Sequence, residues 1–164
     1  MKSPVDNRAL RSYPPFIMLK EALSQDLVTV GLSVRNKQEV INALLDMLCS
    51  TGKVKDRQQA LQDILANEER MSTGLEQGIA IPHAKTDAVD EMIACVAVSD
   101  HKIDFESIDH KPAHIFIMTL SPKGQTGPHM KFLAEVSRLL KDKKAREKVL
   151  AARDSAELFE LLTG

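Results

Sequence analysis

Two histidines of this 164-residue chain stand where the chemistry of an imidazole with an anion is expected. His83 follows the segment Gly-Ile-Ala-Ile-Pro, whose small residues leave the ring uncrowded, so it is a candidate nucleophile. His129 follows Pro128 at a predicted helix start, where free backbone N–H groups and the helix dipole favour an anion. Each signal is weak alone, because loop histidines are more often solvated and helix-start histidines often only cap. Together they outline a phosphate site.

The remaining histidines and the cysteines are expected to be structural or exposed. They are His101, His110, His114, Cys49 and Cys95. Cys49 lies in a predicted helix and Cys95 in a predicted apolar strand, where a lone thiol usually behaves as a small buried hydrophobic group. A reducing compartment disfavours the alternative, a disulfide between them.

Composition and motifs exclude several classes of function. The chain has 22 Lys and Arg against 23 Asp and Glu, a net charge of −1, which implies no polyanion-binding surface. The two candidate histidines supply at most two metal ligands, and no C-x-x-C motif is present. The signatures of serine hydrolases, P-loop NTPases and dinucleotide enzymes are absent as well. No metal and no cofactor are expected.

Helices are indicated by caps and by apolar residues at helical spacing. Three pairs of an Asn or Asp with a Glu or Gln three residues later predict helix starts, namely Asn36 with Glu39, Asp56 with Gln59, and Asp154 with Glu157. The first two helices form a hairpin, and the third closes the chain. A short helix is predicted at 17–24, and another begins at Pro128.

Strands are predicted at 27–32, 79–82, 92–98 and 113–120. The last two are almost entirely apolar, which is typical of strands covered on both faces. The predicted fold is therefore α/β (α+β): one domain with a mixed β-sheet of about five strands packed between helices. Residues 1–16 are predicted to be a loosely ordered arm, and 17–164 the domain.

A cytoplasmic location is expected. The longest apolar run, 92–98, is far shorter than the roughly 18 to 20 residues that span a bilayer. The first fifteen residues contain no apolar core of a secretory signal.

Three segments resemble the mannitol/fructose-type (type 2) enzyme IIA domain of the bacterial phosphoenolpyruvate-dependent phosphotransferase system. STGLEQGIAIPHAK, residues 72–85, resembles its active-site signature. HKIDFESIDHKPAHIFIMTLSP, residues 101–122, is similar to its Asp-Phe, turn and apolar strand ending in Pro, and GQTGPHMKFLAEVSRLL resembles its second histidine and helix. The resemblance covers roughly residues 17–163 and implies that family's fold.

The resemblance implies a phosphotransferase component that works through a phosphohistidine. His83 would accept a phosphoryl group from the histidine-containing phosphocarrier protein and pass it to an enzyme IIB cysteine during sugar uptake, while His129 would help to bind that group. The alternative is a nitrogen-type regulatory enzyme IIA, phosphorylated on the same His83 and read out by binding target proteins. Neither function involves nucleic acid or direct membrane insertion.

Phosphoryl transfer sets physical requirements on this site. A neutral imidazole attacks phosphorus only if its other nitrogen holds the proton, usually through a hydrogen bond to a carbonyl or carboxylate. The transition state is loose, so the protein contributes mainly positioning and electrostatic stabilisation. The helix start at Pro128 and His129 suit this task. Because the group must be passed on, an anion site of moderate strength is expected.

One position departs from the family pattern. Family members commonly carry an Arg-Glu pair sixteen and fifteen residues before the active histidine, where this chain has Asn67 and Glu68. We hypothesise that Arg70 takes the place of the missing arginine. The alternative is a solvated arginine at a helix C-terminus, where cations are favoured.

An apolar rim for the two successive partners is expected at Met71, Leu75 and Met130, although Leu75 fits the core better.

Overall fold

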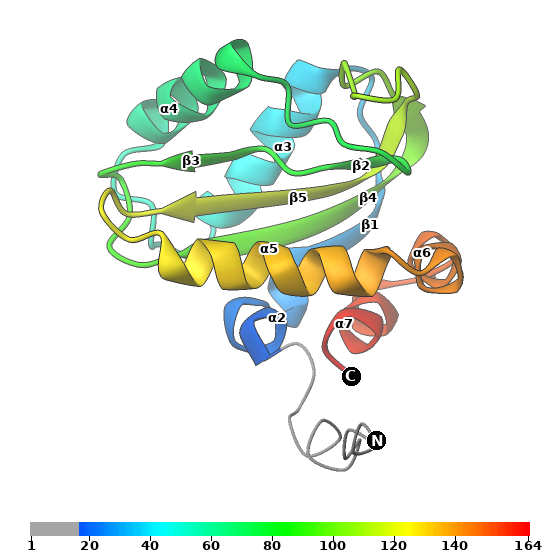
Figure 1. Ribbon diagram of the computed structural model, residues 1–164. Helices are drawn as coiled ribbons and strands as arrows, with labels where there is room; N and C mark the ends of the chain where they lie inside the picture. The colour runs from blue at the N-terminus through cyan, green and yellow to red at the C-terminus, as the bar shows by residue number, and fades with distance from the viewer. Residues whose placement is uncertain (1–16) are drawn as a thin grey trace, which may run out of the picture.

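The computed structural model describes residues 17–164 (Figure 1). In chain order the elements are helix α2 (Ile17–Ala22), a 3₁₀ turn (Gln25–Leu27), strand β1 (Val28–Leu32), helices α3 (Lys37–Cys49) and α4 (Arg57–Arg70), strands β2 (Ile79–Ala80), β3 (His83–Lys85), β4 (Ile93–Ile103) and β5 (Ala113–Ser121), and helices α5 (Gly127–Leu140), α6 (Lys143–Leu150) and α7 (Ser155–Thr163). The predicted arm, residues 1–16, lies outside the described residues.

The strands of residues 17–164 form a five-stranded mixed sheet, which confirms the predicted fold class. Its order is β1-β4-β5-β2, and β3 also pairs with β5, beyond β2. β4 and β5 are antiparallel, whereas β1 runs parallel to β4, and both β2 and β3 run parallel to β5. The two long apolar runs are therefore the centre of the sheet, as their sequence indicates. The short strands β2 and β3 form the edge next to β5.

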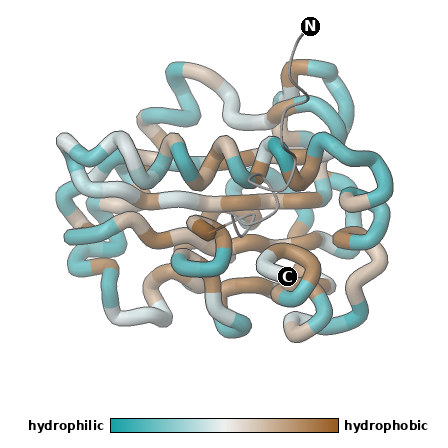
Figure 2. Tube along the Cα trace, turned by 60° about the horizontal axis from the view of Figure 1, so that its bottom comes forward, coloured by the Kyte–Doolittle hydropathy of each residue, from teal (hydrophilic) through white to brown (hydrophobic). Residues whose placement is uncertain are grey.

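Helices cover both faces of the sheet (Figure 1). The hairpin of α3 and α4 lies on one side, and α2, α5 and α7 lie on the other. The interior between these layers is apolar, and Figure 2 shows the hydrophobic stretches along the strands with hydrophilic residues along the outer loops. Fully buried side chains come from both layers and the sheet, among them Leu19, Ile41, Leu44, Phe116, Met118 and Phe132. Helix α4 packs directly against the edge strand β3.

The three predicted caps are present. The side chains of Asn36, Asp56 and Asp154 accept the backbone N–H of Glu39, Gln59 and Glu157 at 2.9, 3.1 and 2.8 Å. Such a cap is worth about 1 kcal/mol. The predicted stripe of α3 is buried, with Val40, Ile41, Leu44, Leu45 and Leu48 facing the core. No helix within residues 17–164 has the length and apolar character needed to span a bilayer.

Three elements differ from the sequence interpretation. His83 lies in the short strand β3 rather than in a loop, because the chain pairs with β5 again after Pro82. Strand β4 continues to Ile103, which places His101 in a strand. Helix α6 was not predicted from the sequence, since Val149 is its only buried residue among those described and its pattern is mainly charged.

The two glycines before β2 are needed for packing. Gly78 has φ +74°, and a Cβ there would lie 2.8 Å from the His114 ring. A Cβ on Gly74 would lie 2.6 Å from the Ser107 hydroxyl and 2.8 Å from the Phe105 carbonyl oxygen. At these two positions the missing side chain lets the segment before β2 pack closely against residues 105–114. The space is filled by the protein itself and is not available to a ligand.

Candidate active site

The structure brings His83 and His129 together. Their ring centroids are 5.0 Å apart, and the ring planes are tilted by 33°. His83 opens β3 and lies opposite Thr119 of β5 in the parallel register. His129 lies in the first turn of α5, the yellow-to-orange helix drawn along the lower side of the sheet in Figure 1. The fold therefore unites the two histidines singled out from the sequence, whereas His101, His110 and His114 do not line their pocket.

An open pocket of about 750 Å³ surrounds the pair. It is lined by Asp63, Ala66, Asn67, Glu69, Arg70, His83, Ala84, Lys85, Ser121, Thr126, His129 and Met130. His83 is half-buried, and His129 is only 8% exposed. The floor of the pocket is thus reachable at His83, while the His129 ring is largely withdrawn from water.

The hydrogen bond of His83 fixes its tautomer. Its Nδ1 lies 2.8 Å from the carbonyl oxygen of Ile81, two residues earlier in the chain. A carbonyl oxygen accepts hydrogen bonds and donates none, so Nδ1 carries the proton. Nε2 then holds the free lone pair. This is the arrangement that nucleophilic attack by a neutral imidazole requires.

His129 is held by a neighbour in the sheet. Its Nδ1 lies 2.9 Å from the hydroxyl oxygen of Thr119. Burial, with smaller contributions from His83 and Lys85, lowers the pKa of His129 from 6.5 to about 4. The ring is therefore neutral at pH 7, with one nitrogen that donates and one that accepts.

Asn67 contacts both the backbone of His83 and the side chain of Arg70. Its side-chain amide donates to the carbonyl oxygen of His83 at 2.9 Å, and its own carbonyl accepts from the Arg70 guanidinium at 3.0 Å. Arg70 is exposed at the last position of α4 and lines the pocket. From the sequence, Asn67 stands out only as the position of the missing arginine, and Arg70 as its proposed substitute. The bridge itself gives no signal there, because one of the partners is a backbone carbonyl.

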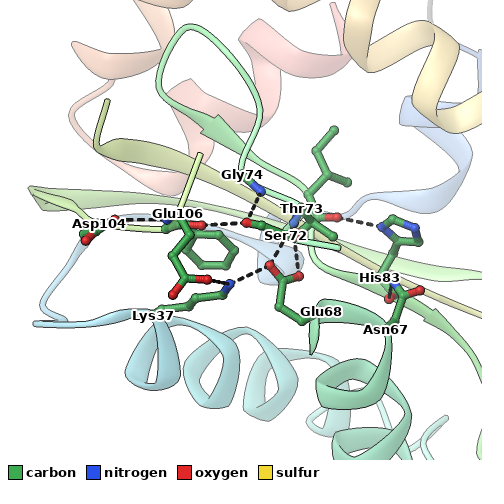
Figure 3. A network of polar contacts seen from close by, with 11 residues as sticks. Lys37, Asn67, Glu68, Ser72, Thr73, Gly74, His83, Asp104 and Glu106 are labelled. Atoms are coloured by element: carbon green, nitrogen blue, oxygen red, sulfur yellow. Dashed lines mark hydrogen bonds and ion pairs between the residues drawn. The ribbon is translucent and has the colours of Figure 1, made fainter. Parts of the chain in front are cut away.

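Behind the pocket, a buried carboxylate ties α4 to the segment before β2 (Figure 3). Glu68 accepts from the backbone N–H and the hydroxyl of Thr73 at 2.8 and 2.6 Å. The ammonium group of Lys37, from α3, lies 2.8 Å from the same carboxylate and 3.4 Å from Glu106. These contacts anchor the C-terminal turn of α4, from which the neighbouring Asn67 bonds to the strand that carries His83.

Besides Arg70 on α4, a second cationic side chain, that of Lys85, lines the pocket near the start of α5. Lys85 is two residues after His83 on the same strand, and its ammonium donates to the hydroxyl of Thr126 at 2.6 Å. The Met130 N–H makes the first backbone bond of α5, to the Thr126 carbonyl. The amides of Gly127 and His129 precede it, so they lack intrahelical acceptors. This corner is suited to an anion.

The expected apolar rim is present in part. Met71 is 77% exposed and Met130 56% exposed, the latter at the pocket itself. Leu75 is partly buried and packs against the core, as expected from the sequence.

Comparison with known proteins assigns the family. Residues 21–164 match the family described as "Phosphoenolpyruvate-dependent sugar phosphotransferase system, EIIA 2". The chain therefore belongs to this enzyme IIA family. It is 36% identical over 137 residues to the fructose-specific EIIA component of Haloferax volcanii, covering 84% of this chain and 89% of that protein.

Two further relatives represent the two branches of the family. The chain is 31% identical over 144 residues to the fructose-specific EIIABC component of Bacillus subtilis, which is 88% of this chain but only 23% of that longer protein. It is 28% identical over 146 residues to a nitrogen regulatory protein of Bradyrhizobium diazoefficiens, covering 88% of this chain and 94% of that protein.

Solved structures share the fold. The nitrogen regulatory protein IIA-Ntr of Neisseria meningitidis superposes with a TM-score of 0.82 at 23% identity, over 89% of this chain and 99% of that chain. The mannitol enzyme IIA in its complex with phosphorylated enzyme IIB, from Escherichia coli, gives a TM-score of 0.74 at 20% identity, over 85% of this chain and 96% of that chain.

Proposed function

We propose that this protein is a phosphoryl carrier of the sugar phosphotransferase system. His83 accepts the group from the histidine-containing phosphocarrier protein and passes it to an enzyme IIB cysteine. The observation that carries the proposal is the His83 ring, which has its Nδ1 proton held by Ile81 and lies 5.0 Å from the His129 ring in an open pocket. Membership of the enzyme IIA family supports it.

In the accepting step, the lone pair of His83 Nε2 forms a bond to phosphorus. The donor's bond to phosphorus breaks, and its electron pair stays with the donor. The Nδ1 proton remains on His83, and the Ile81 carbonyl stabilises the positive charge that the ring gains. No cofactor is needed, and the reverse sequence at the same atom delivers the group to the next carrier.

Groups on both sides of the pocket stabilise the negative charge of the phosphoryl oxygens. His129 supplies a neutral N–H donor, and Arg70 on α4 supplies a guanidinium that is already bonded to Asn67. Lys85 and the free amides of α5 act from the opposite side. Arg70 and Lys85 are exposed, so water screens both charges and the site holds the group with moderate strength. That suits a group in transit.

Partner proteins must reach His83 through the mouth of the pocket. The exposed side chain of Met130 offers an apolar contact there, which successive partners can share. The mannitol enzyme IIA that shares this fold is known in a complex with phosphorylated enzyme IIB, which supports an enzyme IIB domain as the second partner.

A second candidate function is regulatory. The match to the nitrogen regulatory protein of B. diazoefficiens covers 94% of that protein, and IIA-Ntr of N. meningitidis has the same fold. In this function the same His83 is phosphorylated, and target proteins distinguish the two states. The neighbouring genes separate the candidates: sugar transporter components favour the carrier, and nitrogen-response sigma factor genes favour the regulator.

The direct test is incubation with phosphoenolpyruvate, enzyme I and the phosphocarrier protein, followed by intact mass measurement. We expect an acid-labile gain of one phosphoryl group in the wild type and in His101→Ala, a control histidine outside the pocket, but none in His83→Ala. Label that persists in His83→Ala overturns the assignment. Addition of enzyme IIB domains then distinguishes the carrier, which loses its label to one of them, from the regulator, which retains it.

A further inference from the structure

Thr119 is the neighbour of His129 that the proposed chemistry leaves without a role. It is fully buried in β5, opposite His83 in the register, and its hydroxyl lies 2.9 Å from His129 Nδ1. Within residues 17–164, the hydroxyl has no other hydrogen-bond partner. In the sequence this threonine stands in a continuous apolar run, where a β-branched residue is typical of a strand.

The bond between Thr119 and His129 can be arranged in two ways. In the first, the hydroxyl donates to Nδ1, and the ring proton is on Nε2. In the second, Nδ1–H donates to the hydroxyl oxygen, and the hydroxyl proton must then find another acceptor. None is present among the described residues, so the second arrangement leaves a buried donor unsatisfied. Such a penalty favours the first arrangement by roughly 5- to 150-fold.

We propose that Thr119 is a positioning residue that donates to Nδ1 of His129 and thereby fixes its proton on Nε2. The role in transfer rests on the proposed function, in which His129 faces a phosphoryl group on His83. An Nε2–H donates to a phosphoryl oxygen, whereas an Nε2 lone pair repels it. The two rings then carry opposite tautomers: His83 presents a lone pair, and His129 presents a donor.

The tautomer is measurable without any phosphoryl chemistry. Long-range ¹H–¹⁵N NMR of the unphosphorylated protein at pH 7 distinguishes the protonated from the bare ring nitrogen of each histidine. We expect His129 to carry its proton on Nε2 in the wild type and in Thr119→Ser, and to shift toward a mixture in Thr119→Val, which has nearly the same shape but no hydroxyl. A wild-type His129 protonated on Nδ1 overturns the proposal.

The consequence for transfer is tested by the rate of phosphorylation by the phosphocarrier protein. We expect Thr119→Val to slow it roughly tenfold, and Thr119→Ser to restore most of the rate. Thr29→Val, the same change in the distant strand β1, controls for the loss of a hydroxyl. A Thr119→Val protein with the wild-type tautomer and rate contradicts the proposal. If the wild type accepts no phosphoryl group, the proposed function fails, while the NMR result still decides the role of Thr119.

Discussion

The backbone N–H and the hydroxyl of Thr73 both donate to the carboxylate of Glu68, at 2.8 and 2.6 Å. The carbonyl of Thr73 in turn accepts the N–H of Ile81 at 3.1 Å, and the Ile81 carbonyl accepts the ring N–H of His83. A continuous series of bonds therefore joins a buried carboxylate to the proposed nucleophile (Figure 3). The orientation of the imidazole depends on how firmly this segment is anchored.

Replacement of Glu68 by Gln is expected to destabilise the fold. Gln keeps the size of the side chain but removes its charge and one of its acceptor atoms, so Lys37 loses its nearest negative charge. We expect the free energy of unfolding to fall by about 1 to 3 kcal/mol, measured by urea denaturation. Glu69→Gln, an exposed neighbour on the same helix, should change it little. Equal losses in the two variants would show that the buried pair has no special role.

Removal of the Arg70 guanidinium is expected to slow phosphorylation without abolishing it. Because Arg70 is exposed, its interaction with the phosphoryl oxygens is screened, and we expect Arg70→Ala to be roughly three- to tenfold slower. Arg57 lies on the same helix but pairs with Asp46, away from the pocket lining. The Arg57→Ala protein should therefore be phosphorylated at the wild-type rate. If Arg70→Ala also keeps the wild-type rate, the arginine is only a solvated residue, and the site relies on His129, Lys85 and backbone donors.

The buried His129 makes stability depend on pH. Its pKa is lowered from 6.5 to about 4 in the folded protein, so between these values the unfolded chain binds the additional proton. Burial of the neutral ring therefore contributes fully to the free energy of unfolding above pH 6.5. This contribution is lost as the pH falls toward 4, and the total loss is limited to a value on the order of 3 kcal/mol.

Urea denaturation at pH 7, 5.5 and 4.5 measures this dependence. His129→Gln, which stays neutral throughout, should lose less stability over the same range than the wild type. Parallel losses in both proteins would mean that His129 protonates freely in the folded state.

The exposed Met130 at the pocket allows the docking surface to be tested. Met130→Glu places a charge on the proposed apolar contact, so we expect the KM for the phosphocarrier protein to rise roughly three- to tenfold with little change in kcat. The matched control is Ile108→Glu, which puts the same charge on another exposed apolar residue that does not line this pocket. A KM that responds to neither change, or equally to both, argues against docking at Met130.

Much of the fold follows from local sequence patterns. The caps at Asn36, Asp56 and Asp154 depend on contacts three residues apart, and the central strands on continuous apolar runs, so both are visible in the sequence. Strand β3 has only three residues and exists through its pairing with β5, which no local pattern records. Helix α6 buries too little to show an apolar stripe.

Residues of the candidate site could be singled out from the sequence only where the side-chain type itself suits an anion. His83 and His129 stand out because imidazole in those settings suits an anion. Asn67 contributes by donating to the backbone carbonyl of His83, sixteen residues away. Thr119 of β5 contributes through its bond to His129, which belongs to α5. These residues act through the three-dimensional arrangement of atoms, so their types alone give no signal.

In the proposed mechanism, Nε2 of His83 bears the phosphoryl group. ¹H–¹⁵N and ³¹P NMR of ¹⁵N-labelled protein, after phosphorylation by phosphoenolpyruvate, enzyme I and the phosphocarrier protein, identifies the nitrogen that carries the phosphorus. We expect a single phosphorus–nitrogen coupling at Nε2 of His83, with Nδ1 still protonated through its bond to Ile81. Phosphorus attached to Nδ1 of His83, or to any other histidine, would contradict the account.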